Sequence, residues 1–255
     1  IFYTPSYINA YIATNIYKEP ANKYFEDDKF YKCVVDAYNK ENKASIPYTQ
    51  NLSDSQLGSI KKVECDGYNK SDNAKVKSAK GVEKLTALTY LSAYKNQLTT
   101  IDVSNNTKLK VLNVWGNQLT TIDVSNNTAL TDLSADGNQL TTLDVSNNTA
   151  LSGLNVERNQ LTTIDVSKNT KLTELVAYSN QLTTLDVSRN TTLTELLVHN
   201  NQLTTLDVSK NTKLTRLNVG NNQLTTLDVS KNTALIGLGA SSNKLTTLDV
   251  SKNTA

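Results

Sequence analysis

The residues best suited to acid–base or nucleophilic chemistry begin with a single histidine. His199 is the only histidine among the 255 residues, and the residues 21 positions away on either side, Tyr178 and Gly220, offer no nucleophile. Nucleophilic catalysis needs a nucleophile within hydrogen-bond reach of its base. The sequence therefore does not indicate a catalytic triad or a cysteine protease.

Paired carboxylates are the second candidate for chemistry. Asp132 and Asp136 lie four residues apart, and Glu174 and Glu195 lie one period of 21 residues apart. General acid–base catalysis requires carboxylates with shifted pKa values in a site that excludes water. We expect an open sheet here, with ordinary pKa values, so a solvated acidic strip is favoured. The sequence also contains no Cys/His cluster, phosphate loop or dinucleotide fingerprint. It therefore predicts a protein that is not an enzyme and has no cofactor or metal.

Two cysteines, Cys33 and Cys65, lie in the first third of the chain. They form either one disulfide or two inert buried thiols, and we favour the disulfide. A net charge of +2 offers no polybasic footprint for nucleic acid. No apolar run approaches the ~20 residues of a membrane span. The start, IFYTPSYINAYIATN, lacks the flank of a signal peptide, which suggests a mature secreted chain or an excised piece.

A fixed period governs the rest of the chain. One phrase, exemplified by NQLTTLDVSKNT, recurs every 21 residues, with its aspartate at Asp102, at Asp123 and so on to Asp249. Such self-similarity is typical of stacked repeats rather than of one globular core. We therefore divide the chain into a non-repetitive cap with a first strand, residues 1–80, and an array of about eight turns, residues 81–255.

The aligned turns share the pattern L-x-x-L-x-(A/V)-x-x-N-x-L-T-T-(I/L)-D-V-S-x-N-T-x. Alternation around the second leucine predicts a short strand that pairs with its equivalent in the preceding turn. The asparagine after each strand, from Asn96 to Asn243, is predicted to turn inward and bond backbone groups. The pattern resembles the leucine-rich repeat over about two thirds of the chain. This resemblance implies an α+β repeat solenoid with a parallel, concave β-sheet and an N-terminal helical cap.

The cap is predicted from helical spacing and capping signals. A helix is expected after Asp27 or Asp28, a second one at Ser53 with Gln56 in a capping box, and a strand at KKVECDG. A further helix is expected around residues 5–16. A helical cap followed by 21-residue turns is similar to the internalin-type surface proteins of bacteria. That resemblance implies a secreted or cell-surface protein with a role in adhesion, host interaction or virulence.

Variation between turns is concentrated on one wall of the predicted solenoid. Thr99, Thr100, Asp102 and Ser104 are repeated unchanged in every turn, whereas the outward strand positions are rewritten. Simple drift after duplication predicts variation on every exposed face, so we favour a recognition surface for a protein ligand on the concave sheet. The predicted ligand-binding residues are Tyr90, Tyr94, Lys95, Val111, Asn113, Trp115, Asp132, Asp136, Glu157, Arg158, Glu174, Tyr178, Leu197, His199 and Arg216.

The binding hot spot is predicted at Tyr94 and Trp115, which occupy equivalent positions in adjacent turns. A patch around Tyr178 and His199, which also includes Val176 and Leu197, competes for this role. The repeated aspartates are interpreted as turn caps rather than as calcium ligands.

Two alternatives to a natural binding domain stay open. One is an engineered or selected repeat binder. The other is an ice-binding or self-assembling solenoid that uses the regular Thr/Asp/Ser face. We also expect the parent chain to continue beyond Ala255, where the next turn's leucine is due.

Overall fold

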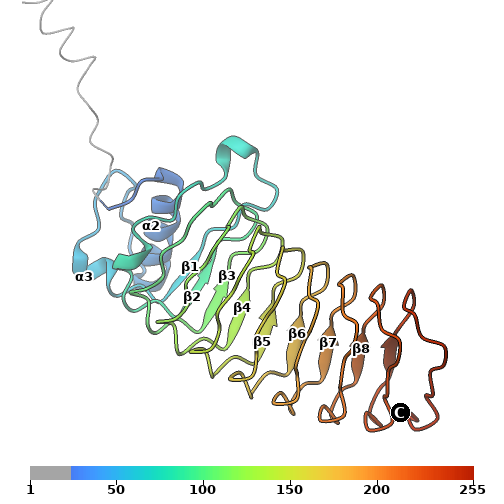
Figure 1. The fold of residues 1–255 in the computed structure, drawn as a ribbon. Helices are drawn as coiled ribbons and strands as arrows, with labels where there is room; N and C mark the ends of the chain where they lie inside the picture. Colours follow the sequence, from blue (N-terminus) through green and yellow to red (C-terminus); the bar gives the residue numbers. More distant parts are fainter. Residues whose placement is uncertain (1–23) are drawn as a thin grey trace, which may run out of the picture.

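The structure is a computed structural model that describes residues 24–255. The helix expected around residues 5–16 lies outside the described residues. Figure 1 shows an elongated solenoid with a helical cap at one end and successive strands arranged side by side along its length. The described strands form one nine-stranded parallel sheet in which the spatial order follows the chain order from β1 to β9. The repeat therefore produces the parallel solenoid that its pattern predicts.

Every strand is three residues long, and each pairs in register with the next. Tyr90 stands opposite Val111, for example, and Val111 opposite Asp132. The central leucine points into the core, as at Leu112 and Leu175, which are fully buried. The strands are β1 (Lys62–Glu64), β2 (Tyr90–Ser92), β3 (Val111–Asn113), β4 (Asp132–Ser134), β5 (Gly153–Asn155), β6 (Glu174–Val176), β7 (Glu195–Leu197), β8 (Arg216–Asn218) and β9 (Gly237–Gly239).

The predicted asparagine ladder ties each turn to its neighbours. The side-chain amide of Asn117 donates to the carbonyl oxygens of Ala93, in the turn before, and of Val114, at 3.0 and 2.9 Å. Its amide oxygen accepts from the backbone N–H of Leu98 at 3.0 Å. Because this bonding recurs through Asn243, the backbone groups freed where each strand ends are satisfied inside the core.

A second asparagine ladder, which was not predicted, runs through the asparagines that follow the repeated D-V-S-x sequence. The side-chain amide of Asn127 donates to the carbonyl oxygens of Val103 and Asn106, both at 2.9 Å. Asn127 is fully buried, as is its equivalent Asn148. The repeated phrase therefore contains two buried amides per turn, and both bond the turn before.

The repeated aspartates cap turns, as the sequence indicated. The carboxylate of Asp123 accepts a hydrogen bond from the backbone N–H of Ser125 at 2.9 Å. Hydrogen bonds from Ser125 hold the pKa of the Asp123 carboxyl below its ordinary value. Asp144 bonds the N–H of Ser146 in the same way. This local bonding is the reason that an aspartate is kept at this position of every turn.

The cap begins with α2 (Asp28–Asn42), whose N-cap Asp27 accepts a hydrogen bond from the Lys29 N–H. The single-turn α3 (Asp54–Leu57) starts with the predicted capping box of Ser53 and Gln56. Short 3-10 helices, η1 (Asp72–Ala74) and η2 (Val82–Lys84), lead into the array. The helix α2 packs against β1 and so covers the first edge of the sheet.

A disulfide joins this cap to the start of the sheet. Cys33, on α2, is bonded to Cys65, the residue after β1, with the two Cα atoms 5.4 Å apart. Cys65 is buried at the same end of the hydrophobic core. The pairing is the one favoured from the sequence.

Candidate protein-binding surface

The outward side chains of the sheet form one continuous surface, here called the sheet face. Residues 21 positions apart in the sequence are neighbours on this face, because each strand is in register with the next. Backbone hydrogen bonds between neighbouring turns continue for two residues after each strand, so the same holds for the positions that follow it. Two rows of side chains matter most. The strand row consists of Tyr90, Val111, Asp132, Gly153, Glu174, Glu195, Arg216 and Gly237. The terminal row consists of Tyr94, Trp115, Asp136, Glu157, Tyr178, His199, Gly220 and Ser241.

Two aromatic rings stack at the N-terminal end of the terminal row. The rings of Tyr94 and Trp115 lie with centroids 5.2 Å apart and planes 12° from parallel. The ammonium group of Lys95 lies 4.3 Å from the Trp115 centroid, and that of Lys62 lies 4.6 Å from the centroid of Tyr90. We call Tyr90, Tyr94, Lys95 and Trp115 the aromatic patch. It presents half-buried rings whose faces favour cations.

A second stacked pair lies further along the terminal row. The rings of Tyr178 and His199 have centroids 4.2 Å apart and an interplanar angle of 17°, with the guanidinium of Arg158 5.7 Å from the Tyr178 centroid. Desolvation by burial lowers the pKa of His199, which favours the neutral imidazole at pH 7. Burial, with a hydrogen bond to Glu157, raises the pKa of Tyr178 to about 12. This pair is a packed aromatic cluster rather than a base beside a nucleophile.

Between the two aromatic pairs lie two buried carboxylates, Asp136 and Glu157. Only 8% of Asp136 and 9% of Glu157 is exposed, although both side chains belong to the outward row. Asp136 accepts a hydrogen bond from the Ser134 hydroxyl at 2.6 Å, and Glu157 pairs with Arg158 at 3.4 Å. Burial raises the pKa of the Asp136 carboxyl, and the charge of Glu157 raises it further. The sheet face therefore keeps two partly compensated negative charges out of water.

The strand row is acidic over the same turns. Glu195 forms an ion pair with Arg216 at 3.2 Å. Desolvation raises the pKa of Glu174, and the charges of Glu195 and Asp132 add to the shift. The expectation of ordinary pKa values on an open sheet was therefore wrong for Asp136 and Glu174. It failed because neighbouring side chains and like charges crowd these carboxyl groups.

A hollow of about 230 Å³ opens in the centre of the sheet face, where β5 begins with Gly153. Gly153 has no side chain, and its register partners on the two sides are Asp132 and Glu174. Tyr90 and Val111 line the hollow on its N-terminal side. Its carboxylates are among the predicted ligand-binding residues, whereas Gly153 is not.

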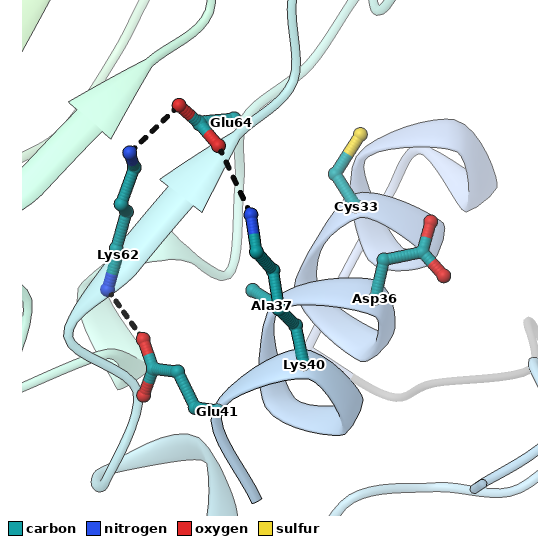
Figure 2. Close-up of a pocket in the computed structure, with 7 residues that line it drawn as sticks. All are labelled: Cys33, Asp36, Ala37, Lys40, Glu41, Lys62 and Glu64. Atoms are coloured by element: carbon teal, nitrogen blue, oxygen red, sulfur yellow. Dashed lines mark hydrogen bonds and ion pairs between the residues drawn. The ribbon is translucent and has the colours of Figure 1, made fainter. Parts of the chain in front are cut away.

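A second cavity, of about 420 Å³, lies between the cap helix α2 and β1. Figure 2 shows its charged rim, where the carboxylate of Glu64 contacts the ammonium groups of Lys62 and Lys40, at 2.8 and 3.8 Å. Glu41 accepts hydrogen bonds from the backbone N–H groups of Lys61 and Lys62. Both lysines of this rim therefore contact Glu64, and Glu41 is held by backbone N–H groups.

Comparison with known proteins identifies the type of solenoid. Internalin J of Listeria monocytogenes serotype 4b (strain F2365) is 43% identical over 86 residues, which are 34% of this chain and 8% of that protein. The solved functional domain of InlJ from Listeria monocytogenes is 43% identical with a TM-score of 0.84, and the match covers 91% of this chain and 49% of that one.

The chain is an internalin-like leucine-rich repeat domain.

One further structure agrees in fold with this internalin-like domain, and one family model matches part of its array. A leucine-rich repeat protein of Leptospira interrogans is 28% identical with a TM-score of 0.70, over 78% of this chain and 54% of that one. A family model described as the LVIVD repeat matches residues 89–113 and 112–132, which contain two turns of the array. The domain spans about half of the solved InlJ chain and a small part of curated Internalin J.

The internalin-like domain differs from the solved InlJ domain in one named feature. That structure is described as including a cysteine ladder, whereas here both cysteines lie outside residues 81–255 and the buried ladders of the array are asparagines. Within residues 24–255, no group of three or more His, Cys, Asp or Glu side chains is placed to hold a metal ion. No helix among the same residues is long and apolar enough to span a bilayer.

The domain places the predicted binding residues on or beside the sheet face. Asn113 and Leu197 occupy the third strand position, next to the strand row. Lys95 and Arg158 follow the terminal row, with positive φ angles of 56° and 51° that direct the chain into the turn. Val176, from the competing patch, has an exposed fraction of only 5% and so offers little surface to a partner. Lys62 was not among the predicted residues, because its place over Tyr90 depends on how β1 joins the sheet.

Proposed function

We propose that this domain binds a protein partner through the sheet face, with Tyr94 and Trp115 as the hot spot. The observation that carries the proposal is the stacked, half-buried pair of rings at this end of the sheet. Rigid aromatic side chains provide large contact areas at low entropic cost, and binding energy is concentrated in such anchors. The invariance of the opposite Thr/Asp/Ser wall supports the same assignment, because drift alone would alter both walls.

The role proposed for this binding is adhesion or host interaction by a secreted or surface-displayed protein. Support comes from the likeness to the Listeria internalins, which gives the type of domain and not its ligand. A binding function is also preferred to catalysis, since His199 stacks on Tyr178 rather than meeting a nucleophile. We therefore propose a non-enzymatic recognition domain that needs no cofactor.

The test uses the domain as bait on extracts of candidate host cells, followed by affinity measurement with each purified partner. Trp115→Ala is expected to weaken binding by at least about 2 kcal/mol, the usual hot-spot threshold. Thr142→Ala, on the opposite wall, serves as the control and should leave affinity unchanged. If Trp115→Ala costs less than about 0.5 kcal/mol while Tyr178→Ala exceeds the threshold, the hot spot lies at the second aromatic pair instead.

A further inference from the structure

The central part of the sheet face carries an excess of negative charge. Between β4 and β8 its outward carboxylates are Asp132, Asp136, Glu157, Glu174 and Glu195, and its outward cations are Arg158 and Arg216. Both cations are already paired, with Glu157 and Glu195 respectively. Asp132 and Glu174 have no ion pair with any described residue. The uncompensated charge is therefore centred on the hollow over Gly153.

The geometry of the hollow suits a basic side chain. Asp132 and Glu174 flank Gly153 in the same row, so their Cα atoms are about 9.5 Å apart, twice the spacing of strands. The Asp132 carboxylate leans over the glycine, since its Oδ1 is 3.0 Å from where a Cβ would stand. The hollow of about 230 Å³ is large enough for a guanidinium or ammonium group, and such groups form charge-assisted bonds of about 2.8 Å with carboxylates.

The lining of the hollow also suits the aliphatic part of a lysine or arginine side chain. Tyr90 and Val111 form an apolar flank on its N-terminal side, while Asn113 and Asn155 add polar groups. Lysine and arginine side chains have an aliphatic stem and a charged head. The stem packs on apolar surface, while the head stays hydrated or forms an ion pair. A bare metal ion is a poor occupant, because within residues 24–255 no three His, Cys, Asp or Glu side chains are placed to hold one.

We propose that the hollow over Gly153 receives an arginine or lysine side chain of the protein partner, so that the sheet face selects a basic segment. This rests on the proposed function, because it assumes that the partner lies on the sheet face. Charge complementarity is the ground for choosing a basic segment over an acidic or neutral one. Desolvation and the charges of Glu195 and Asp132 raise the pKa of Glu174, which is consistent with a carboxylate that forms no ion pair with a described residue.

The probe is the peptide Ac-Gly-Arg-Gly-Arg-Gly-NH2, compared with the same peptide carrying uncharged citrulline in place of arginine. Binding is followed by amide chemical shifts in the isotope-labelled domain. The arginine peptide is expected to produce saturable shifts centred on Asp132, Gly153 and Glu174, with at least tenfold weaker binding for the citrulline peptide. Equal binding of the two peptides, or shifts located elsewhere, would overturn the proposal.

Matched variants separate the hollow from general electrostatics. Gly153→Val fills the hollow with a residue that the same row already holds at Val111, and should weaken binding at least tenfold. Gly237→Val makes the same change in β9, where an added Cβ meets only the Arg216 stem at 3.8 Å, and should bind like the parent domain. If both valine variants bind like the parent, the hollow is not the site.

The charge is tested by a second matched pair. The double variant Asp132→Asn with Glu174→Gln should abolish the peptide-induced shifts, whereas Asp144→Asn with Asp165→Asn, the same loss of charge on the opposite wall, should retain them. Equal effects of the two double variants would overturn the proposal, as would saturable shifts of the same amides with calcium chloride in place of the peptide. Circular dichroism verifies that all four variants fold.

The outcomes distinguish this inference from the proposed function. If the hollow ignores the arginine peptide while an identified partner still depends on Trp115, the basic-segment inference fails and the protein-binding function stands. If the peptide binds as expected but no partner depends on Trp115, the hot spot at the aromatic patch fails and the cation-binding hollow stands.

Discussion

At the scale of single residues, the sheet face contains a buried carboxylate that forms no ion pair with any described residue. Asp136 is an outward carboxylate with 8% exposure, held by the Ser134 hydroxyl and close to the charge of Glu157. A carboxyl group whose pKa is raised by folding opposes folding whenever it is ionised. Residues of this kind are typical of binding sites, where stability is lost for function.

Asp136→Asn is therefore expected to stabilise the domain at pH 7, by about 0.5–2 kcal/mol, the usual range for a single stabilising substitution. Asparagine keeps the acceptor for Ser134 and removes the charge. The sign follows from linkage: the destabilisation is full above the raised pKa and disappears as pH falls below the unfolded value of about 3.9. Denaturant unfolding at pH 7 and pH 3.5 measures the difference, which should shrink at the lower pH.

Glu195→Gln is the matched control, since Glu195 lies on the same face and is paired with Arg216. It should give no stabilisation at pH 7. A gain equal to that of Asp136→Asn would show that net charge, rather than burial of one carboxyl group, controls stability here.

At the scale of elements, the cap and the array depend on each other. The apolar residues of α2 cover one end of the core, and Val34 and Val35 are fully buried there. An exposed solenoid end would leave apolar surface in water, so the cap contributes to the stability of the first turns. The disulfide from Cys33 to Cys65 adds a covalent connection at this junction.

Replacing both cysteines, Cys33→Ala with Cys65→Ala, is expected to lower the free energy of unfolding by about 3–4 kcal/mol. That figure is the loop-entropy estimate for a sequence separation of 32 residues. Guanidinium titrations of the parent and the variant give the difference. Detection of two free thiols in the denatured, unreduced parent protein would contradict the disulfide itself.

At the scale of the whole molecule, the array behaves as a stack of equivalent units. Each strand contacts only the strands before and after it, and the asparagine ladders reach one turn back. In such a structure, stability is the sum of the turns and of the interfaces between neighbours. The length of the array is therefore adjustable in steps of one period.

Deleting residues 138–158, one full period, is expected to leave a folded solenoid with one strand fewer. After this deletion Gly137 is followed directly by Asn159, which is the equivalent of the deleted Asn138 in the next turn. Deleting residues 139–158 leaves one extra residue in that turn, which disrupts both ladders locally. Circular dichroism and thermal unfolding should show a cooperative transition for the first deletion and a broadened or lower one for the second. Equal behaviour of both would contradict the fixed register.

The sequence by itself determined the period, the parallel strands and the inward asparagine from Asn96 to Asn243. These features repeat in every turn and follow from local geometry, because alternation around a leucine defines a strand and a buried amide needs backbone partners. The period also predicts which outward residues are neighbours. The rows that hold Tyr94 beside Trp115 and Asp132 beside Gly153 are therefore readable from spacing alone.

Only the tertiary structure decided how deeply each outward residue lies and what it meets. The burial of Asp136, the stacking of Tyr178 on His199 and the hollow over Gly153 depend on the sizes and rotamers of side chains in the turns on both sides. The position of Lys62 over Tyr90 depends on how the cap joins the sheet. A repeat pattern specifies that two positions are about 4.8 Å apart, but exposure and electrostatics arise from the packed surroundings of both.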